Sequence, residues 1–234
     1  MARTWLVVMG ILFGVAGAAR ADDAEARKRA FQDLDRMRTQ GEAARGGGNM
    51  VPGAAELSRD HRHLGFYFRP DLGFGFMSMS ESSSFGDMKI SGATGVFGLH
   101  IGGAIQENLI LGFHLYDAVI VNPTIELNGV SQTFSDATAG LVGFGPELTY
   151  YFMPQNIYLS TTLALSKATI ERNGTSGSTD TGFGARVSLG KEWWVSRHWG
   201  LGAVGHLDFA SNKDGAAGTL QTLGASIAFS ATYN

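Results

Sequence analysis

The sequence contains no cysteine, only five prolines, and 17% charged residues in a chain of 234. Without cysteine there can be neither disulfide bonds nor thiolate metal ligands. Beyond residue 21, the chain also lacks an apolar run long enough to cross a bilayer as a helix. The formal net charge of −3 provides no basic surface for nucleic acid. These absences exclude a disulfide scaffold, a bundle of transmembrane helices and a nucleic-acid-binding domain.

The N-terminal 21 residues predict a cleaved export signal. Arg3 precedes the apolar run TWLVVMGILFGVAGA, and Ala19-Arg20-Ala21 has the small-x-small pattern of a cleavage site. The alternative is an uncleaved anchor in the inner membrane, but the run is shorter than the ~20 residues that a span needs. We therefore expect a protein exported across the inner membrane.

Residues 22–63 predict a short periplasmic helix followed by a glycine-rich linker. The stretch DDAEARKRAFQDLDRMRTQ is charged, and Phe31, Leu34 and Met37 form a narrow apolar stripe. This helix could contact a periplasmic partner, or it could be a solvated extension. His61 and His63 lie two residues apart, but two ligands do not make a metal site. We expect both to be solvated near the membrane, and predict neither a metal site nor a cofactor.

From residue 64 to 234 the chain alternates apolar and polar residues, as in LGFYFRPDLGFGFMSMS at its start. Short breaks interrupt the pattern at Gln106–Leu109, Pro154–Ile157 and Ser196–Trp199. Longer polar breaks of six to ten residues begin at Ser80, Asn128, Arg172 and Ser211. Three short turns and four loops connect eight strands. The glycine content, 33 residues, also favours strands with tight turns.

The sizes of the alternating residues indicate which face of each strand contacts lipid and which faces the lumen. One parity carries bulky Phe, Leu and Trp, and the other is small, glycine-rich and polar. An eight-stranded barrel has too little interior space for the bulky set, so this set must face outward, into lipid. The barrel must also close, because an open edge in hydrocarbon leaves backbone groups unpaired. We expect an interfacial girdle near the short turns, formed by Tyr150, Phe152, Trp193, Trp199 and Tyr233.

Charged residues and histidines of the inward parity predict a polar network that fills the lumen. Buried charges must be paired and hydrogen-bonded, and Arg69 with Glu147 is one candidate pair. Pro70 and Pro146 lie inside strands, where proline usually marks a bulge that would change the facing of its neighbours. The predicted network comprises Arg69, Asp71, His100, His114, Glu147, Arg186, His206 and Asp208.

The signal, the alternating strands, the short turns and the polar loops together resemble the small outer-membrane barrels of Gram-negative bacteria, the group of outer-membrane proteins A, X and W. The closing LGASIAFSATYN resembles the assembly signal of that group, with Gly224, Ile227, Phe229 and Tyr233 in place, although it ends in Asn234 instead of an aromatic residue. The resemblance implies an all-β, eight-stranded, antiparallel, up-and-down transmembrane barrel in the outer membrane. It also implies a blocked or gated lumen and contact with the barrel-assembly machinery.

Rim cations add a candidate lipid contact. Lys89, Lys167, Arg172 and Lys213 lie near the long loops, where they could bind lipopolysaccharide phosphates or simply extend toward water.

Three classes of function follow. The first is a structural or interaction barrel without enzymatic activity. The second is a narrow channel or a conduit for small hydrophobic molecules. The third is an enzyme that acts on lipid A, for which GHLDFAS is the candidate stretch. In that stretch His206 and Asp208 share a face but Ser211 lies on the other, so we expect lumen filling instead of catalysis.

Overall fold

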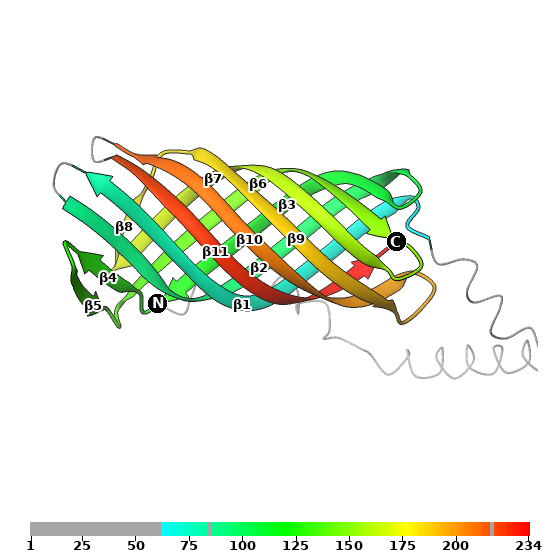
Figure 1. The fold of residues 1–234 in the computed structure, drawn as a ribbon, viewed down its shortest axis with the longest axis horizontal. Coiled ribbons are helices and arrows are strands. Elements are labelled where there is room, and N and C mark those ends of the chain that lie inside the picture. The colour runs from blue at the N-terminus through cyan, green and yellow to red at the C-terminus, as the bar shows by residue number, and fades with distance from the viewer. Residues whose placement is uncertain (1–61, 84–85, 216–217) are drawn as a thin grey trace, which may run out of the picture. The chain divides into compact units, whose positions relative to one another are not determined.

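The computed structural model describes residues 62–83, 86–215 and 218–234, which form a closed barrel (Figure 1). The predicted signal, helix and most of the linker lie outside the described residues. Within those residues, no helix is long and apolar enough to span a membrane. The barrel strands are β1 (Phe66–Ser83), β2 (Gly86–Gln106), β3 (Leu109–Val121), β6 (Ala137–Phe152), β7 (Ile157–Arg172), β9 (Gly182–Trp194), β10 (Trp199–Asp214) and β11 (Gly218–Tyr233).

Each barrel strand pairs antiparallel with the next one along the chain, and β1 pairs with β11 to close the sheet. A path from Met79 that steps from each residue to its partner on the next strand, beginning with β11, returns to β1 at Arg69. The strands are therefore tilted, with a register stagger of ten residues. The predicted eight-stranded, antiparallel, up-and-down barrel is confirmed.

The exterior of the barrel is a continuous apolar band. Outward side chains such as Phe74 (68% exposed), Leu163 (65%) and Phe183 (77%) have no protein cover. On β1 the band runs from Phe66 to Phe76. Ten residue steps of ~3.3 Å, tilted by about 40°, span roughly 25 Å, the height of the lipid-facing band in membrane barrels. Only lipid can cover a surface of this kind, so the barrel is a transmembrane one.

The predicted girdle residues all lie exposed on the exterior at the short-turn end. Tyr150 and Phe152 stand beside the β6–β7 turn, with ring centroids 4.9 Å apart. Trp199 and Tyr233 lie on neighbouring strands, with centroids 5.3 Å apart. Trp193 lies at the end of β9. This placement matches the girdle that the sequence predicts.

The two strand prolines do not create bulges. The pairing of β1 with β11 is interrupted at Arg69 and Pro70, but it resumes in the same register at Asp71. The β6–β7 pairing is likewise interrupted at Gly145 and Pro146 and resumes in register. The expected bulge is wrong because each proline only omits ladder hydrogen bonds on one side. The facing of the residues around them is preserved.

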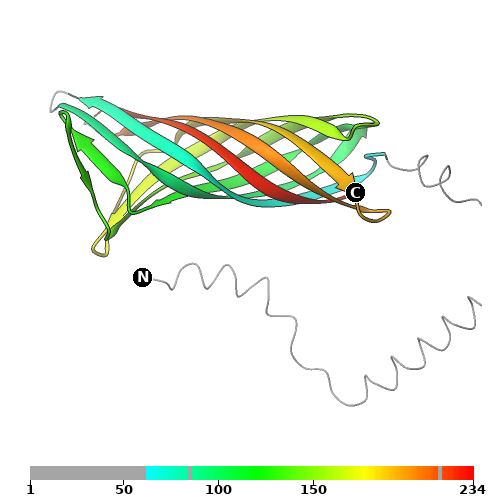
Figure 2. The same cartoon turned by 60° about the horizontal axis from the view of Figure 1, so that its bottom comes forward.

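The polar breaks are strands for much of their length. β4 (Thr124–Leu127) and β5 (Val130–Thr133) form a hairpin whose first strand pairs with β2, and β8 (Thr175–Ser178) pairs with β7. The turns are Asn128-Gly129 and Asn173-Gly174, all with positive φ. Figure 2 shows β4 and β5 projecting from the end opposite the C-terminus. The predicted loops at Asn128 and Arg172 thus contain short strands, because Asn-Gly supplies the backbone conformation that continues a hairpin.

Candidate functional site in the barrel lumen

All eight residues of the predicted network point into the lumen, and none is more than 4% exposed. They come from six of the eight barrel strands. Solvent does not reach them, so the lumen is filled at their level. Their burial requires that charge be balanced and hydrogen bonds be made inside the barrel.

His100 is the centre of the lower part of the network. Its Nδ1 lies 2.7 Å from Glu147 Oε2, and its Nε2 lies 2.8 Å from Asp71 Oδ2. His114 stacks on the His100 ring, with centroids 3.6 Å apart. The His114 Nδ1 lies 2.9 Å from Thr162 Oγ1 and 3.3 Å from Glu147 Oε2. Glu147 therefore contacts both imidazoles.

The Arg69 guanidinium balances this acidic cluster from below. Its Nη2 lies 3.6 Å from Glu147 Oε1, so the structure brings the predicted pair together. The guanidinium carbon also lies 4.3 Å from the centroid of the Tyr158 ring, a cation–π contact. Tyr158 lies across from Gly190 in the next strand, where any Cβ would overlap the tyrosine ring. Glycine at this position is thus what allows the ring to lie flat against the wall.

Arg186 and Asp208 form a second, higher ion pair. Nε and Nη2 of the arginine donate to the two carboxylate oxygens, at 2.5 and 3.0 Å. The guanidinium carbon lies 4.2 Å from the centroid of the Tyr116 ring. This bidentate geometry is the strongest kind of arginine–carboxylate contact.

His206 connects the two clusters. Its Nδ1 lies 2.7 Å from the hydroxyl of Ser188, and its Nε2 lies 3.6 Å from Asp71 Oδ1. Serine, histidine and aspartate thus stand in a row, but all three are at most 2% exposed. Ser211, the serine of the stretch noted in the sequence, faces outward and is exposed. The buried row offers a substrate no path to Ser188, and Ser211 lies on the opposite face of the wall from His206 and Asp208.

A cluster at the short-turn mouth was missed from the sequence. His63, expected to be solvated, is fully buried there. It stacks on Tyr151 with ring centroids 3.5 Å apart, and its Nε2 lies 2.7 Å from Asn156 Oδ1. Its Nδ1 contacts the side chain of Asn234. Burial lowers the pKa of His63, which precedes β1, to about 4, and the positive charge of Arg69 adds to the effect.

Glu192 is the carboxylate of the same mouth. It accepts hydrogen bonds from the hydroxyls of Thr232, at 2.5 Å, and Tyr151, at 3.1 Å. The sequence places Glu192 on the inward parity, but it does not show that His63, Thr232 and the β6–β7 turn meet at this point. The mouth is closed by residues far apart in the chain.

Above the network the lumen holds a layer of buried apolar side chains. The prediction that inward residues are small and polar throughout is wrong in this layer. At the level of this layer, the outward residues of β1 change from Phe76 to Ser78 and Ser80. The outer surface of the wall there therefore faces water. The interior is accordingly packed as in a soluble barrel. The layer consists of Met77, Met79, Ile90, Ile120, Leu141 and Leu220, with small alanines between them.

All four rim cations are exposed, and three of them point outward from barrel strands. Lys89, Lys167 and Lys213 are on β2, β7 and β10 just above the apolar band. Arg172 instead lies 4.3 Å from the Phe134 ring centroid and 3.7 Å from Asp136. The lysines are therefore the members of this set that are placed to meet lipid headgroups.

No family model matches the chain, and no curated protein matches it. Solved structures similar to it include Neisserial surface protein A, at 16% identity and a TM-score of 0.48, with coverage of 72% of this chain and 96% of that one. The outer-membrane protein AlkL matches at 9% identity and a TM-score of 0.45, with coverage of 80% and 95%. OprG from Pseudomonas aeruginosa matches at 13% and 0.41, with coverage of 74% and 97%.

At these identities the likeness concerns the fold alone, and no function is transferred from it. AlkL and OprG are outer-membrane proteins. The integral membrane barrel is shown by this chain's own closed sheet and apolar exterior.

Proposed function

We propose that this protein is a non-conducting outer-membrane barrel that anchors structured hairpins at the cell surface and has no enzymatic activity. The observation that carries the proposal is the double closure of the lumen. A hydrogen-bonded polar network fills the membrane-embedded part, and the apolar layer fills the part above it. Ions would have to cross both.

The hairpins supply the surface for interaction. The β4–β5 hairpin exposes Leu127 (53%) and Val130 (75%) beyond the lipid band. All four residues of β5 are exposed, and among the described strands β5 pairs with β4 alone. An exposed strand edge with apolar side chains is suited to strand addition by a partner protein. The exposed lysines below it would hold the rim against lipopolysaccharide phosphates.

Conductance in planar lipid bilayers tests the proposal. The purified protein is inserted, and insertion is verified by the change in gel mobility between heated and unheated samples. We expect no current steps above those of bilayers that contain detergent alone. Reproducible steps would contradict the closed lumen and favour the narrow channel.

The enzyme alternative has its own test. Overproduction of the protein should leave the lipid A profile of the cell unchanged, as measured by mass spectrometry. A new lipid A species that disappears in a Ser188→Ala variant would contradict the proposal.

A further inference from the structure

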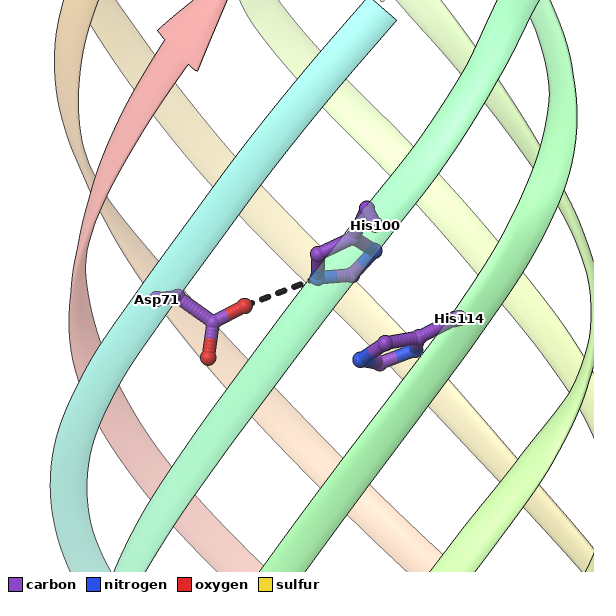
Figure 3. A group of neighbouring side chains, drawn as sticks. All are labelled: Asp71, His100 and His114. Atoms are coloured by element: carbon purple, nitrogen blue, oxygen red, sulfur yellow. Dashed lines mark hydrogen bonds and ion pairs between the residues drawn. The ribbon is translucent and has the colours of Figure 1, made fainter. Parts of the chain in front are cut away.

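Three histidines direct a ring nitrogen toward one carboxylate in the lumen. One ligand atom from each of Asp71, His100 and His114 lies within 4.8 Å of the others. Figure 3 shows the two imidazoles extending from neighbouring strands toward the Asp71 side chain. His206 approaches from the other side, with its Nε2 3.6 Å from Asp71 Oδ1. Three donors of the kind that bind divalent transition metals thus lie close to one another, and His206 contacts the other oxygen of the same carboxylate.

The opposite nitrogen of each histidine is already held by a polar group. Glu147 contacts Nδ1 of His100 and of His114, and Ser188 contacts Nδ1 of His206. In metal sites, the histidine nitrogen that faces away from the metal usually donates to a carboxylate, carbonyl or water. This outer contact fixes the ring so that Nε2 is presented as the ligand. All three rings satisfy this pattern.

Several of the converging atoms have no other partner. Nε2 of His114, Nε2 of His206 and Oδ1 of Asp71 are buried and make no hydrogen bond. An unsatisfied buried polar atom destabilises a protein by about 1–3 kcal/mol. A ligand placed among these atoms would satisfy all of them at once.

The charges of the membrane-embedded lumen, below the apolar layer, also leave room for a dication. Arg69 and Arg186 supply two positive charges, whereas Asp71, Glu147, Glu192 and Asp208 carry four acidic groups. One divalent ion balances this excess. Arg69 would repel a bound cation, because its Nη2 lies 3.3 Å from His100 Nε2. The negative charge of Glu147, whose Oε1 lies 3.6 Å from the same Nη2, reduces this repulsion.

We propose that this cluster binds one divalent transition-metal ion of the zinc class, with Asp71, His100, His114 and His206 as ligands. The stacked rings of His100 and His114 must tilt toward a common centre to share the ion. Since solvent does not reach the cluster, the ion enters while the barrel folds.

The test is to refold the full chain into detergent micelles with zinc sulfate or with a chelator, and then to remove unbound metal. Zinc content is measured by inductively coupled plasma mass spectrometry, and the midpoint of thermal unfolding is recorded for each sample. The variants are His114→Gln, His206→Gln and Ser188→Ala, with His198→Gln as the matched control, because His198 is exposed at the turn. The gel-mobility change confirms that every variant is folded.

We expect about one zinc per wild-type and His198→Gln barrel, and a higher unfolding midpoint with zinc than with chelator. His114→Gln and His206→Gln should lose the bound zinc, and Ser188→Ala should weaken binding about 10–100-fold. Two results would overturn the proposal. One is a folded wild-type barrel without zinc and with the same midpoint in both samples. The other is equal zinc in the His114→Gln and His206→Gln barrels, which would place the metal elsewhere.

Discussion

The lower and upper parts of the lumen are both filled by side chains, but the lower part is filled by polar residues and the upper part by apolar ones. In the lower part, lipid surrounds the wall, and the interior holds Arg69, Glu147 and three histidines. In the upper part, water surrounds the wall, and the interior holds Met79, Leu141 and their neighbours. The backbone is continuous through both, so the solvent outside determines which parity is apolar. Where the wall leaves the bilayer, the outward face changes from apolar to polar and the inward face from polar to apolar.

This comparison predicts the largest loss of stability for a broken ion pair in the lower part. Arg186→Met leaves Asp208 buried without its partner and should lower the free energy of unfolding by about 3–5 kcal/mol. The double variant Arg186→Met, Asp208→Leu should recover most of this loss. Urea unfolding in lipid vesicles measures both. A double variant as unstable as the single one would show that the charges are needed for more than mutual compensation.

In the upper part, the largest effect should come from a cavity. Leu141→Ala removes a fully buried side chain and should lower the free energy of unfolding by about 2–5 kcal/mol. Val130→Ala, on the exposed hairpin, should change it by less than about 0.5 kcal/mol. The same unfolding measurement applies. Similar values for the two variants would mean that the layer is not packed as a core.

A smaller loss of unfolding free energy is expected at Gly190, where the strand backbone packs against the Tyr158 ring. Gly190→Ala places a Cβ in the space of the Tyr158 ring, which must then move away from Arg69. Overpacking of this kind destabilises by about 1–3 kcal/mol. Gly129→Ala is less suitable as a control because its φ is positive, so Gly95→Ala, in open space on β2, serves instead. Equal unfolding free energies for the two variants would contradict the close fit.

The contribution of the short-turn mouth to the free energy of unfolding should depend on pH through His63. The folded-state pKa of His63, about 4, lies below the unfolded value of 6.5, so the folded form resists protonation. Its neutral form is favoured above pH 6.5, and this contribution is lost as the pH falls from 6.5 toward 4. Between pH 7 and 5, wild type should lose about 2 kcal/mol more unfolding free energy than His63→Gln. Parallel pH profiles of the two proteins would show that His63 is not buried.

The strand count, the closure and the outward set followed from the sequence, because alternation with bulky residues on one parity has a single solution in an eight-stranded barrel. The pairing of Arg69 with Glu147 was also visible, since buried charges need partners. The apolar layer was not predicted, because Met77 and Met79 share the parity of Arg69 and Asp71 and only the height of the bilayer separates them. Had the change from Phe76 to Ser78 been taken as the membrane boundary, the layer would have followed.

The remaining errors concern long-range geometry and turns. His63 is buried through contacts with Tyr151, Asn156 and Asn234, which are distant in sequence. Nothing local distinguishes it from the solvated residues beside it. The β4–β5 hairpin has a local signal, Asn128-Gly129 between the apolar residues Leu127 and Val130, in a stretch that the polar composition assigns to a loop. The zinc ligands lie on four strands, so their convergence depends on the register stagger.

The exchange of faces can be tested most directly with single cysteines, since the chain has none of its own. Cysteine is introduced at Phe74, Met79 and Ser80 on β1, and each folded variant in lipid vesicles is treated with a water-soluble maleimide. The account predicts labelling only at Ser80, because Phe74 faces lipid and Met79 lies in the apolar layer. Labelling at Met79 would contradict the closed upper lumen, and labelling at Phe74 would contradict the lipid-facing band.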